Sequence, residues 1–129
     1  MTTLPKSRTI LVVEHDEVTT ETYAHSLRVE GYQVRTALSA DAGLRDVAVH
    51  PPHAILVDFR MPGMNGLEFV RQLRAREQGR TIPVAIVTGD YLLPDTIDVQ
   101  LKALGAEVLF KPLWLDDLAT FVHKLVTPV

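Results

Sequence analysis

The sequence contains no cysteine among its 129 residues. Disulfide bonds, thiolate metal sites and thiol nucleophiles are therefore excluded, and this composition agrees with the cytoplasmic location that we expect. No apolar run reaches the roughly 18 residues that a membrane-spanning helix needs, and residues 1–8 lack the apolar centre of a signal peptide. The formal net charge is −3, so no basic surface for nucleic acid is indicated. We therefore expect neither a membrane nor a nucleic-acid partner.

What the chain does contain is the composition of one ordinary globular domain. Apolar residues make up 47% of the chain and charged residues 22%, and this length is enough for a single hydrophobic core. We expect residues 1–8 to be a short tail and residues 9–126 to form the domain. No internal repeat, linker or low-complexity tract divides it.

Short apolar segments alternate with helical patterns along the whole chain. Predicted strands cover residues 9–13, 32–37, 54–57, 83–87 and 108–110, and predicted helices cover residues 17–30, 40–49, 66–73, 94–104 and 115–125. A short continuous run rich in β-branched residues, such as 9–13, is typical of a strand that is buried on both faces of a parallel sheet. Five βα units predict an α/β fold with right-handed crossovers. We expect a flavodoxin-like, doubly wound, five-stranded parallel sheet of order 2-1-3-4-5 with five helices.

The boundaries of these helices are marked by residues that stop or start helices. Gly31 and Gly105 follow the first and fourth helical patterns, where glycine ends helices readily. Ser39 and Asn65 precede the second and third helices and are expected to be N-caps. Pro51 and the proline after it prevent the second helix from continuing.

Polar residues follow the ends of four predicted strands. They are Glu14, His15, Asp16, Asp58, Thr88 and Lys111. Strand order 2-1-3-4-5 makes strands one, three, four and five neighbours, so the six side chains are expected to converge at the carboxyl edge of the sheet, where such folds bind ligands. No glycine fingerprint follows the first strand, which argues against a dinucleotide site.

The residue types at this edge suggest phosphoryl chemistry. Clustered carboxylates repel one another, and Mg²⁺ relieves that cost through oxygen ligands. An ionised Asp58 can attack phosphorus, while Lys111 and the Thr88 hydroxyl can interact with the transferred oxygens. A new phosphoryl group of about −2 charge would attract both residues and change the loop and helix that follow the fourth strand.

At this point the sequence resembles the receiver domains of response regulators, the chemotaxis-regulator-like switches of two-component signalling. The resemblance extends from about Thr9 to Leu125. It rests on these motifs: Ile-Leu-Val-Val before the acidic residues at 14–16, Val-Asp at 57–58, Met-Pro-Gly-Met-Asn-Gly at 61–66, Ile-Pro-Val at 82–84, Thr-Gly at 88–89, Gly-Ala at 105–106 and Lys-Pro at 111–112.

The resemblance implies a function and a set of site residues. Asp58 is then the acceptor of a phosphoryl group from a histidine kinase or phosphotransfer protein, and Thr88 and Lys111 read the phosphorylation. Mg²⁺ is implied near Glu14, His15 and Asp58, with the backbone carbonyl of Arg60. The Lys111–Pro112 peptide is implied to be cis. The chain is then a signalling switch, with only self-catalysed phosphoryl transfer and slow autodephosphorylation.

The resemblance also implies how the signal leaves the domain. The surface made by the fourth helix, the fifth strand and the fifth helix changes and regulates an output partner, which the sequence does not identify. We expect a monomer or a weak homodimer.

The sequence departs from the family pattern at three places. His15 occupies the position of the second acid, and a neutral imidazole is a poorer Mg²⁺ ligand than a carboxylate. Val108 occupies the position of the usual switch aromatic, three residues before the lysine. Arg60 and Asp90 each lie two residues after a site residue, and we hypothesise that this pair covers the site and slows attack by water.

Two other functions remain open at this stage. The departures at His15 and Val108 fit a pseudo-receiver, a protein-binding module that works without phosphorylation. A phosphohydrolase with Asp58 as nucleophile is disfavoured, because Arg60 stands where a second catalytic acid would be. Trp114 is interpreted either as partial core packing or as an exposed anchor for a partner. The other histidines are scattered and predict no metal cluster.

Overall fold

The fold is a five-stranded parallel sheet with helices on both faces. The structure is a computed structural model that describes residues 8–89 and 93–127. The strands are β1 (Thr9–Val13), β2 (Gln33–Ala37), β3 (Ala54–Asp58), β4 (Val84–Thr88) and β5 (Ala106–Phe110). They pair in the order β2-β1-β3-β4-β5, and every pair is parallel. The predicted fold class and strand order are therefore confirmed.

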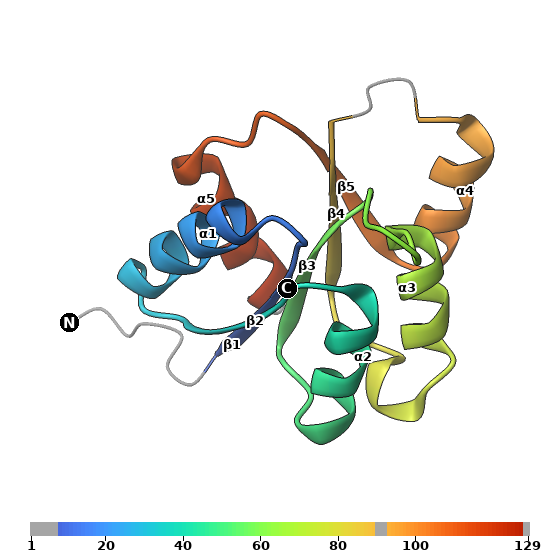
Figure 1. Ribbon diagram of the computed structural model, residues 1–129, viewed down its shortest axis with the longest axis horizontal. Helices are drawn as coiled ribbons and strands as arrows, with labels where there is room; N and C mark the ends of the chain where they lie inside the picture. Colours follow the sequence, from blue (N-terminus) through green and yellow to red (C-terminus); the bar gives the residue numbers. More distant parts are fainter. Residues whose placement is uncertain (1–7, 90–92, 128–129) are drawn as a thin grey trace.

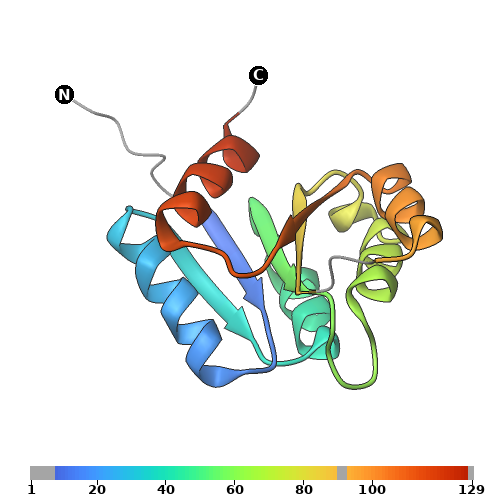
Figure 2. The same ribbon diagram turned by 90° about the horizontal axis from the view of Figure 1, so that it is seen from above.

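Two helices cover one face of the sheet and three cover the other. The helices are α1 (Glu17–Val29), α2 (Ala40–Val49), α3 (Gly66–Arg74), α4 (Asp95–Ala103) and α5 (Leu115–Val126), with a short 3₁₀ helix η1 (Glu77–Gly79). Helices α1 and α5 lie on one side of the sheet, and α2, α3 and α4 lie on the other (Figure 1). Figure 2 shows the same sandwich from above, with the strands between the two helical layers. No helix of the described residues is long and apolar enough to cross a membrane.

Each helical layer has its own hydrophobic core against the sheet. In the layer of α1 and α5, the core includes Ile10, Val12, Tyr23, Leu27, Leu56, Leu118 and Val122. In the layer of α2, α3 and α4, it includes Leu11, Val13, Leu44, Val57, Phe69, Val70, Ile86 and Leu101. Neighbouring strand residues alternate between the two cores, which is why β1, β3 and β4 are buried at every position.

Local signals at the helix ends act as the sequence predicts. The Ser39 hydroxyl accepts the Ala42 N–H at 3.1 Å, and the Asn65 side chain accepts the Glu68 N–H at 3.0 Å. Gly31 has φ of 104° after α1, a conformation in which a side chain would be strained. Ser39 and Asn65 thus define where α2 and α3 begin, and Gly31 defines where α1 ends.

The structure differs from the prediction at the less buried elements. Strand β5 begins at Ala106 rather than Val108, because the exposed Glu107 interrupts the apolar run. Strand β2 begins at Gln33 instead of Tyr32, and η1 is not predicted at all. Both strands lie at edges of the sheet, where exposed positions weaken the apolar pattern.

Arg74, at the end of α3, links three turns at the amino-terminal edge of the sheet. Its guanidinium donates hydrogen bonds to the carbonyls of Gly79 at 2.8 Å and Ile82 at 2.7 Å. A third hydrogen bond goes from Nε to the Leu104 carbonyl at 2.8 Å. Partial burial lowers the pKa of Arg74, because removal from water disfavours the charged form.

We expect Arg74→Met to reduce the free energy of unfolding by about 2 kcal/mol, because three partly buried carbonyls lose their donor while the aliphatic packing stays. Urea denaturation followed by circular dichroism measures the loss. Arg45→Met, on the exposed side of α2, is the matched control and should change stability by less than about 0.5 kcal/mol. Equal stabilities of the two variants would show that this hydrogen-bonded link is unimportant.

Candidate functional site

The parallel strands deliver their following residues to one edge of the sheet. Glu14 follows β1 and remains tied to β2, because its N–H donates to the Ala37 carbonyl at 3.0 Å. Asp58 is the last residue of β3, and Thr88 is the last residue of β4. Lys111 follows β5, and its N–H donates to the Thr88 carbonyl at 2.8 Å. The topology therefore brings these predicted site residues to the same edge.

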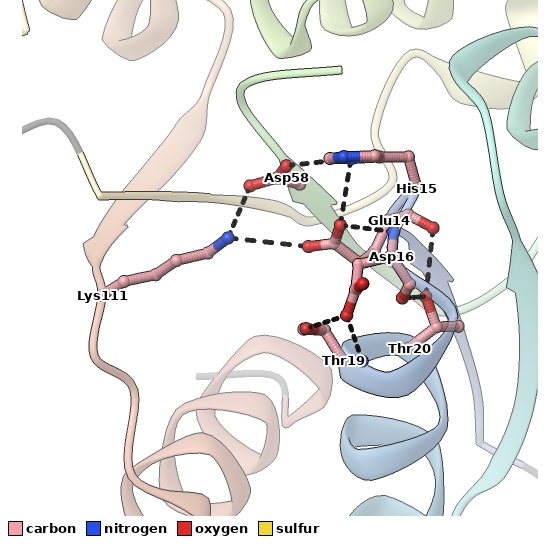
Figure 3. A network of polar contacts seen from close by, with 7 residues as sticks. All are labelled: Glu14, His15, Asp16, Thr19, Thr20, Asp58 and Lys111. Carbon is pink, nitrogen blue, oxygen red and sulfur yellow. Dashed lines mark hydrogen bonds and ion pairs between the residues drawn. The ribbon is translucent and has the colours of Figure 1, made fainter. Parts of the chain in front are cut away.

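The two oxygens of the Asp58 carboxylate face different partners. Lys111 Nζ lies 3.0 Å from Oδ1 of Asp58 and 3.6 Å from Oε1 of Glu14. On the other side, Nδ1 of His15 lies 3.8 Å from Oδ2 of Asp58 and 3.3 Å from Oε2 of Glu14. Figure 3 shows these side chains converging from the ends of β1 and β3 and from the segment after β5. The two acids are thus held between a lysine and an imidazole.

Burial strengthens the electrostatic interactions between the charged side chains of this group. Glu14 is 3% exposed and Asp58 is 6% exposed, so their mutual repulsion is poorly screened by water. Burial of Lys111 acts to lower its pKa, but the hydrogen bond and attraction from Asp58, with Glu14, outweigh it and leave the pKa raised. Lys111 therefore stays cationic and offsets part of the repulsion between the acids.

Asp16 does not join this group, contrary to the expectation that all six side chains converge. Its carboxylate is the N-cap of α1 and accepts the N–H of Thr19 at 2.8 Å and the Thr19 hydroxyl at 2.6 Å. These hydrogen bonds lower the pKa of Asp16. Its backbone does serve the site, since the Asp16 N–H donates to Oε2 of Glu14 at 2.9 Å. Sequence patterns do not reveal this orienting role, although the cap position itself was open to prediction.

Within residues 8–89 and 93–127, Glu14, His15 and Asp58 form the single group of three or more side chains placed so that they could hold a metal ion. One ligand atom of each lies within 4.8 Å of the others. Two carboxylate oxygens suit Mg²⁺, whereas the imidazole of His15 does not supply the further oxygen that this ion prefers.

An open pocket surrounds the free side of this group. It is lined by His15, Asp58, Arg60, Thr88, Gly89 and Lys111. Thr88 is therefore at the same pocket as Asp58 and Lys111, as predicted, and the side chain of His15 is 48% exposed at its rim. The guanidinium carbon of Arg60 lies 5.9 Å from the centre of the Phe59 ring. Asp90, the hypothesised partner of Arg60, lies outside the described residues.

Three further features bear on the expectations from sequence. The Lys111–Pro112 peptide is cis, as the resemblance implies. Val108, at the position of the usual aromatic, pairs with Ile86 in the sheet and packs on the core beside α4. Trp114 is 71% exposed, so the interpretation as core packing is wrong.

Comparison with known proteins agrees with this architecture. The family model for the response regulator receiver domain matches residues 10–123. The transcriptional regulatory protein PrrA of Mycobacterium bovis is 30% identical over 117 residues, which are 91% of this chain and 49% of that protein. The response regulator MprA of a Mycobacterium species is 32% identical over 120 residues, 91% of this chain and 50% of that protein. The chain thus spans about half the length of these curated relatives.

Solved structures show the same likeness. Chemotaxis protein CheY4 of Vibrio cholerae superposes with a TM-score of 0.85 at 27% identity, covering 92% of this chain and 98% of that one. The receiver domain of a signal transduction histidine kinase from Syntrophus aciditrophicus gives a TM-score of 0.82 at 30% identity, covering 93% and 90%. With its sheet order and the family match over residues 10–123, this chain belongs to the response regulator receiver domains of two-component signalling.

Proposed function

We propose that Asp58 accepts a phosphoryl group from a phosphohistidine of a histidine kinase or phosphotransfer protein. The observation that carries the proposal is the position of the buried Asp58 carboxylate, 3.0 Å from the Lys111 ammonium. It opens on the pocket that Thr88 also lines. A carboxylate in this position can reach phosphorus, while its neighbours meet the charge on the phosphoryl oxygens.

The transfer forms one bond and breaks one bond. An oxygen of Asp58 attacks phosphorus, the phosphorus–nitrogen bond of the donor breaks, and its electron pair stays on the donor imidazole. The product is an aspartyl phosphate. Lys111 neutralises charge on the phosphoryl oxygens, and the Thr88 hydroxyl donates a hydrogen bond to one of them. A bound divalent cation would add further charge neutralisation at Glu14 and Asp58.

A groove beside the pocket supports a protein as the phosphoryl donor. It is lined by Val18, Thr19, Thr22, Tyr23, Lys111, Pro112 and Leu113. Lys111 lines both the groove and the phosphoacceptor pocket, and Val18 is exposed in the first turn of α1. A donor helix on this groove would bring its phosphohistidine to Asp58. Together with the family membership, this favours a kinase or phosphotransfer partner.

We propose that the signal leaves through the surface of α4, β5 and α5. The Lys111 N–H is hydrogen-bonded to the Thr88 carbonyl. Attraction of the Thr88 and Lys111 side chains to a phosphoryl group therefore acts on the ends of β4 and β5 together. Phe110 and Trp114 are exposed near the end of β5 and the start of α5, where an output partner would sense the change. Because residue 108 is valine, this readout involves no switch aromatic at that position.

We propose that the domain spans residues 9–126 after a tail of residues 1–8, acts in the cytoplasm as a monomer or weak homodimer, and catalyses only its own phosphorylation and slow dephosphorylation. The backbone carbonyl of Arg60 is proposed as a further cation ligand.

Acetyl phosphate with a divalent cation tests the acceptor directly. Intact mass spectrometry should show the addition of one phosphoryl group to the wild-type chain. Asp58→Asn should show none, because the amide is not a nucleophile of this kind. Asp41→Asn, an exposed acid in the first turn of α2, is the matched control and should react like the wild type. Absence of any phosphorylated species with each cation tried would favour the pseudo-receiver, the alternative that His15 and Val108 support.

Arg60→Ala tests whether the pocket rim protects the aspartyl phosphate. We expect dephosphorylation to become faster by roughly threefold to tenfold, which corresponds to about 0.7–1.4 kcal/mol of barrier, because water gains access when the guanidinium is removed. Loss of the phosphorylated mass after the donor is removed gives the rate. The conservative Arg60→Lys should lie between the two, and an unchanged rate for Arg60→Ala would contradict the covering role.

A further inference from the structure

We propose that Glu14, His15 and Asp58 bind a first-row transition-metal dication, represented by Zn²⁺ and Ni²⁺, more tightly than Mg²⁺. The inference deepens the proposed function by naming the ion that the site selects. It concerns the unphosphorylated chain, so metal binding and phosphorylation can be measured separately.

The geometry of the group favours shared coordination. Nδ1 of His15 is the ring nitrogen that faces both acids, at 3.3 Å from Glu14 Oε2 and 3.8 Å from Asp58 Oδ2. Two ligands of one such ion, each bound at about 2.0–2.2 Å, are separated by roughly 3.0–3.5 Å. One ligand atom of each residue lies within 4.8 Å of the others, and His15 is half-exposed, so side-chain rotations would have to close the group on one ion.

The donor types decide which ion fits. Imidazole nitrogen binds zinc, iron, nickel and copper well, whereas Mg²⁺ favours oxygen donors and strict octahedral geometry. Replacing one of the oxygen donors by His15 therefore weakens Mg²⁺ binding and strengthens binding of the transition metals. The two acids remain suitable for either kind of ion, so the histidine determines the preference.

Lys111 and the metal do not compete for the same oxygen. Lys111 is closest to Oδ1 of Asp58, while His15 faces Oδ2. The Asp16 N–H holds Oε2 of Glu14 on the His15 side, although Oε1 points to Lys111. The side of the group that His15 occupies is thus organised for a cation, and its exposure leaves room for water ligands.

Isothermal titration of the metal-free chain with MgCl₂, NiCl₂ and ZnCl₂ tests the preference. We expect Ni²⁺ and Zn²⁺ to bind at least about tenfold more tightly than Mg²⁺, because imidazole suits both transition metals better than it suits Mg²⁺. His15→Asp should reverse the change, with tighter Mg²⁺ binding and weaker Zn²⁺ binding. His123→Ala, an exposed histidine on α5, is the matched control and should leave all affinities unchanged.

A spectroscopic measurement locates the ion. Substoichiometric paramagnetic Ni²⁺ should broaden the ring resonances of His15 in the NMR spectrum before those of His25 and His123. Mg²⁺ affinity equal to or above that of Ni²⁺ and Zn²⁺ would overturn the inference. So would transition-metal binding that persists in His15→Asp at wild-type strength, because surface histidines would then be the ligands. Metal selectivity without phosphorylation by acetyl phosphate would leave this inference standing and contradict the proposed function, and phosphorylation with Mg²⁺ preferred would do the reverse.

Discussion

Lys111→Met is expected to slow phosphorylation of Asp58 by about 100-fold, the effect of removing one well-placed charge from a transition state. The ammonium lies 3.0 Å from Asp58 Oδ1, next to the position that incoming phosphoryl oxygens would take. Methionine keeps much of the aliphatic volume but supplies no positive charge. Glu14 and Asp58 then repel an anionic donor without any compensation from the lysine.

The rate should be measured with acetyl phosphate and saturating divalent cation, by intact mass over time. Lys102→Met is the matched control, because Lys102 is an exposed lysine of α4 that pairs with Asp98 at 3.1 Å. It should phosphorylate at the wild-type rate. A Lys111→Met chain that phosphorylates as fast as this control would contradict the charge-compensating role of Lys111 in the transfer.

The stability difference between the wild-type chain and Lys111→Met should depend on pH, with a sign set by the pKa of Lys111. The pKa of Lys111 is raised in the fold above its ordinary value of 10.5, so its contribution to stability is fully present below pH 10.5 and is lost as pH rises through the raised pKa. The difference in unfolding free energy between wild type and Lys111→Met should therefore be constant near neutrality. It should become less favourable to the wild type above about pH 10.5, where urea denaturation at several pH values measures it.

Sequence patterns predict this fold best where burial is most complete. The strands β1, β3 and β4 are buried on both faces, so their continuous apolar runs mark them clearly. Helix ends were predicted from Ser39, Asn65 and Gly31, whose effects are local. The start of β5 and the short η1 were not predicted, because an exposed Glu107 and a three-residue 3₁₀ turn leave little trace in hydrophobic periodicity.

The site could be predicted in its membership but not in its detail. Once the strand order is known, Asp58, Thr88 and Lys111 must meet, because parallel strands end at one edge. Which oxygen of Asp58 faces Lys111 depends on side-chain rotamers that sequence patterns do not encode. The backbone contact of Asp16 to Glu14 was missed for the same reason. The capping role of Asp16 was also missed, although an aspartate directly before a helix is a recognisable N-cap signal.

Phe69→Ala should lower the free energy of unfolding by about 3–5 kcal/mol, the range for removing a fully buried aromatic ring. Phe69 of α3 is 0% exposed, and its ring lies where α3 meets Gly43 of α2. The loss is measurable by urea denaturation if the domain has the usual stability of about 5–15 kcal/mol. Phe69→Leu keeps part of the volume and should lose less, and Val49→Ala, exposed at the end of α2, should change stability little.

Gly43 provides the test that this loss reflects packing at one place. A Cβ at Gly43 would lie 2.9 Å from Val13 Cγ2 and 3.1 Å from Phe69 Cε1, so Gly43→Ala overpacks the contact despite the better helix propensity of alanine. In a Phe69→Ala background the ring is gone and Val13 can move into the vacated space. The double variant should therefore be more stable than the sum of the single effects, by at least about 0.5 kcal/mol. Strict additivity would mean that Gly43 and Phe69 do not share one packing contact with Val13, the residue that directly precedes Glu14.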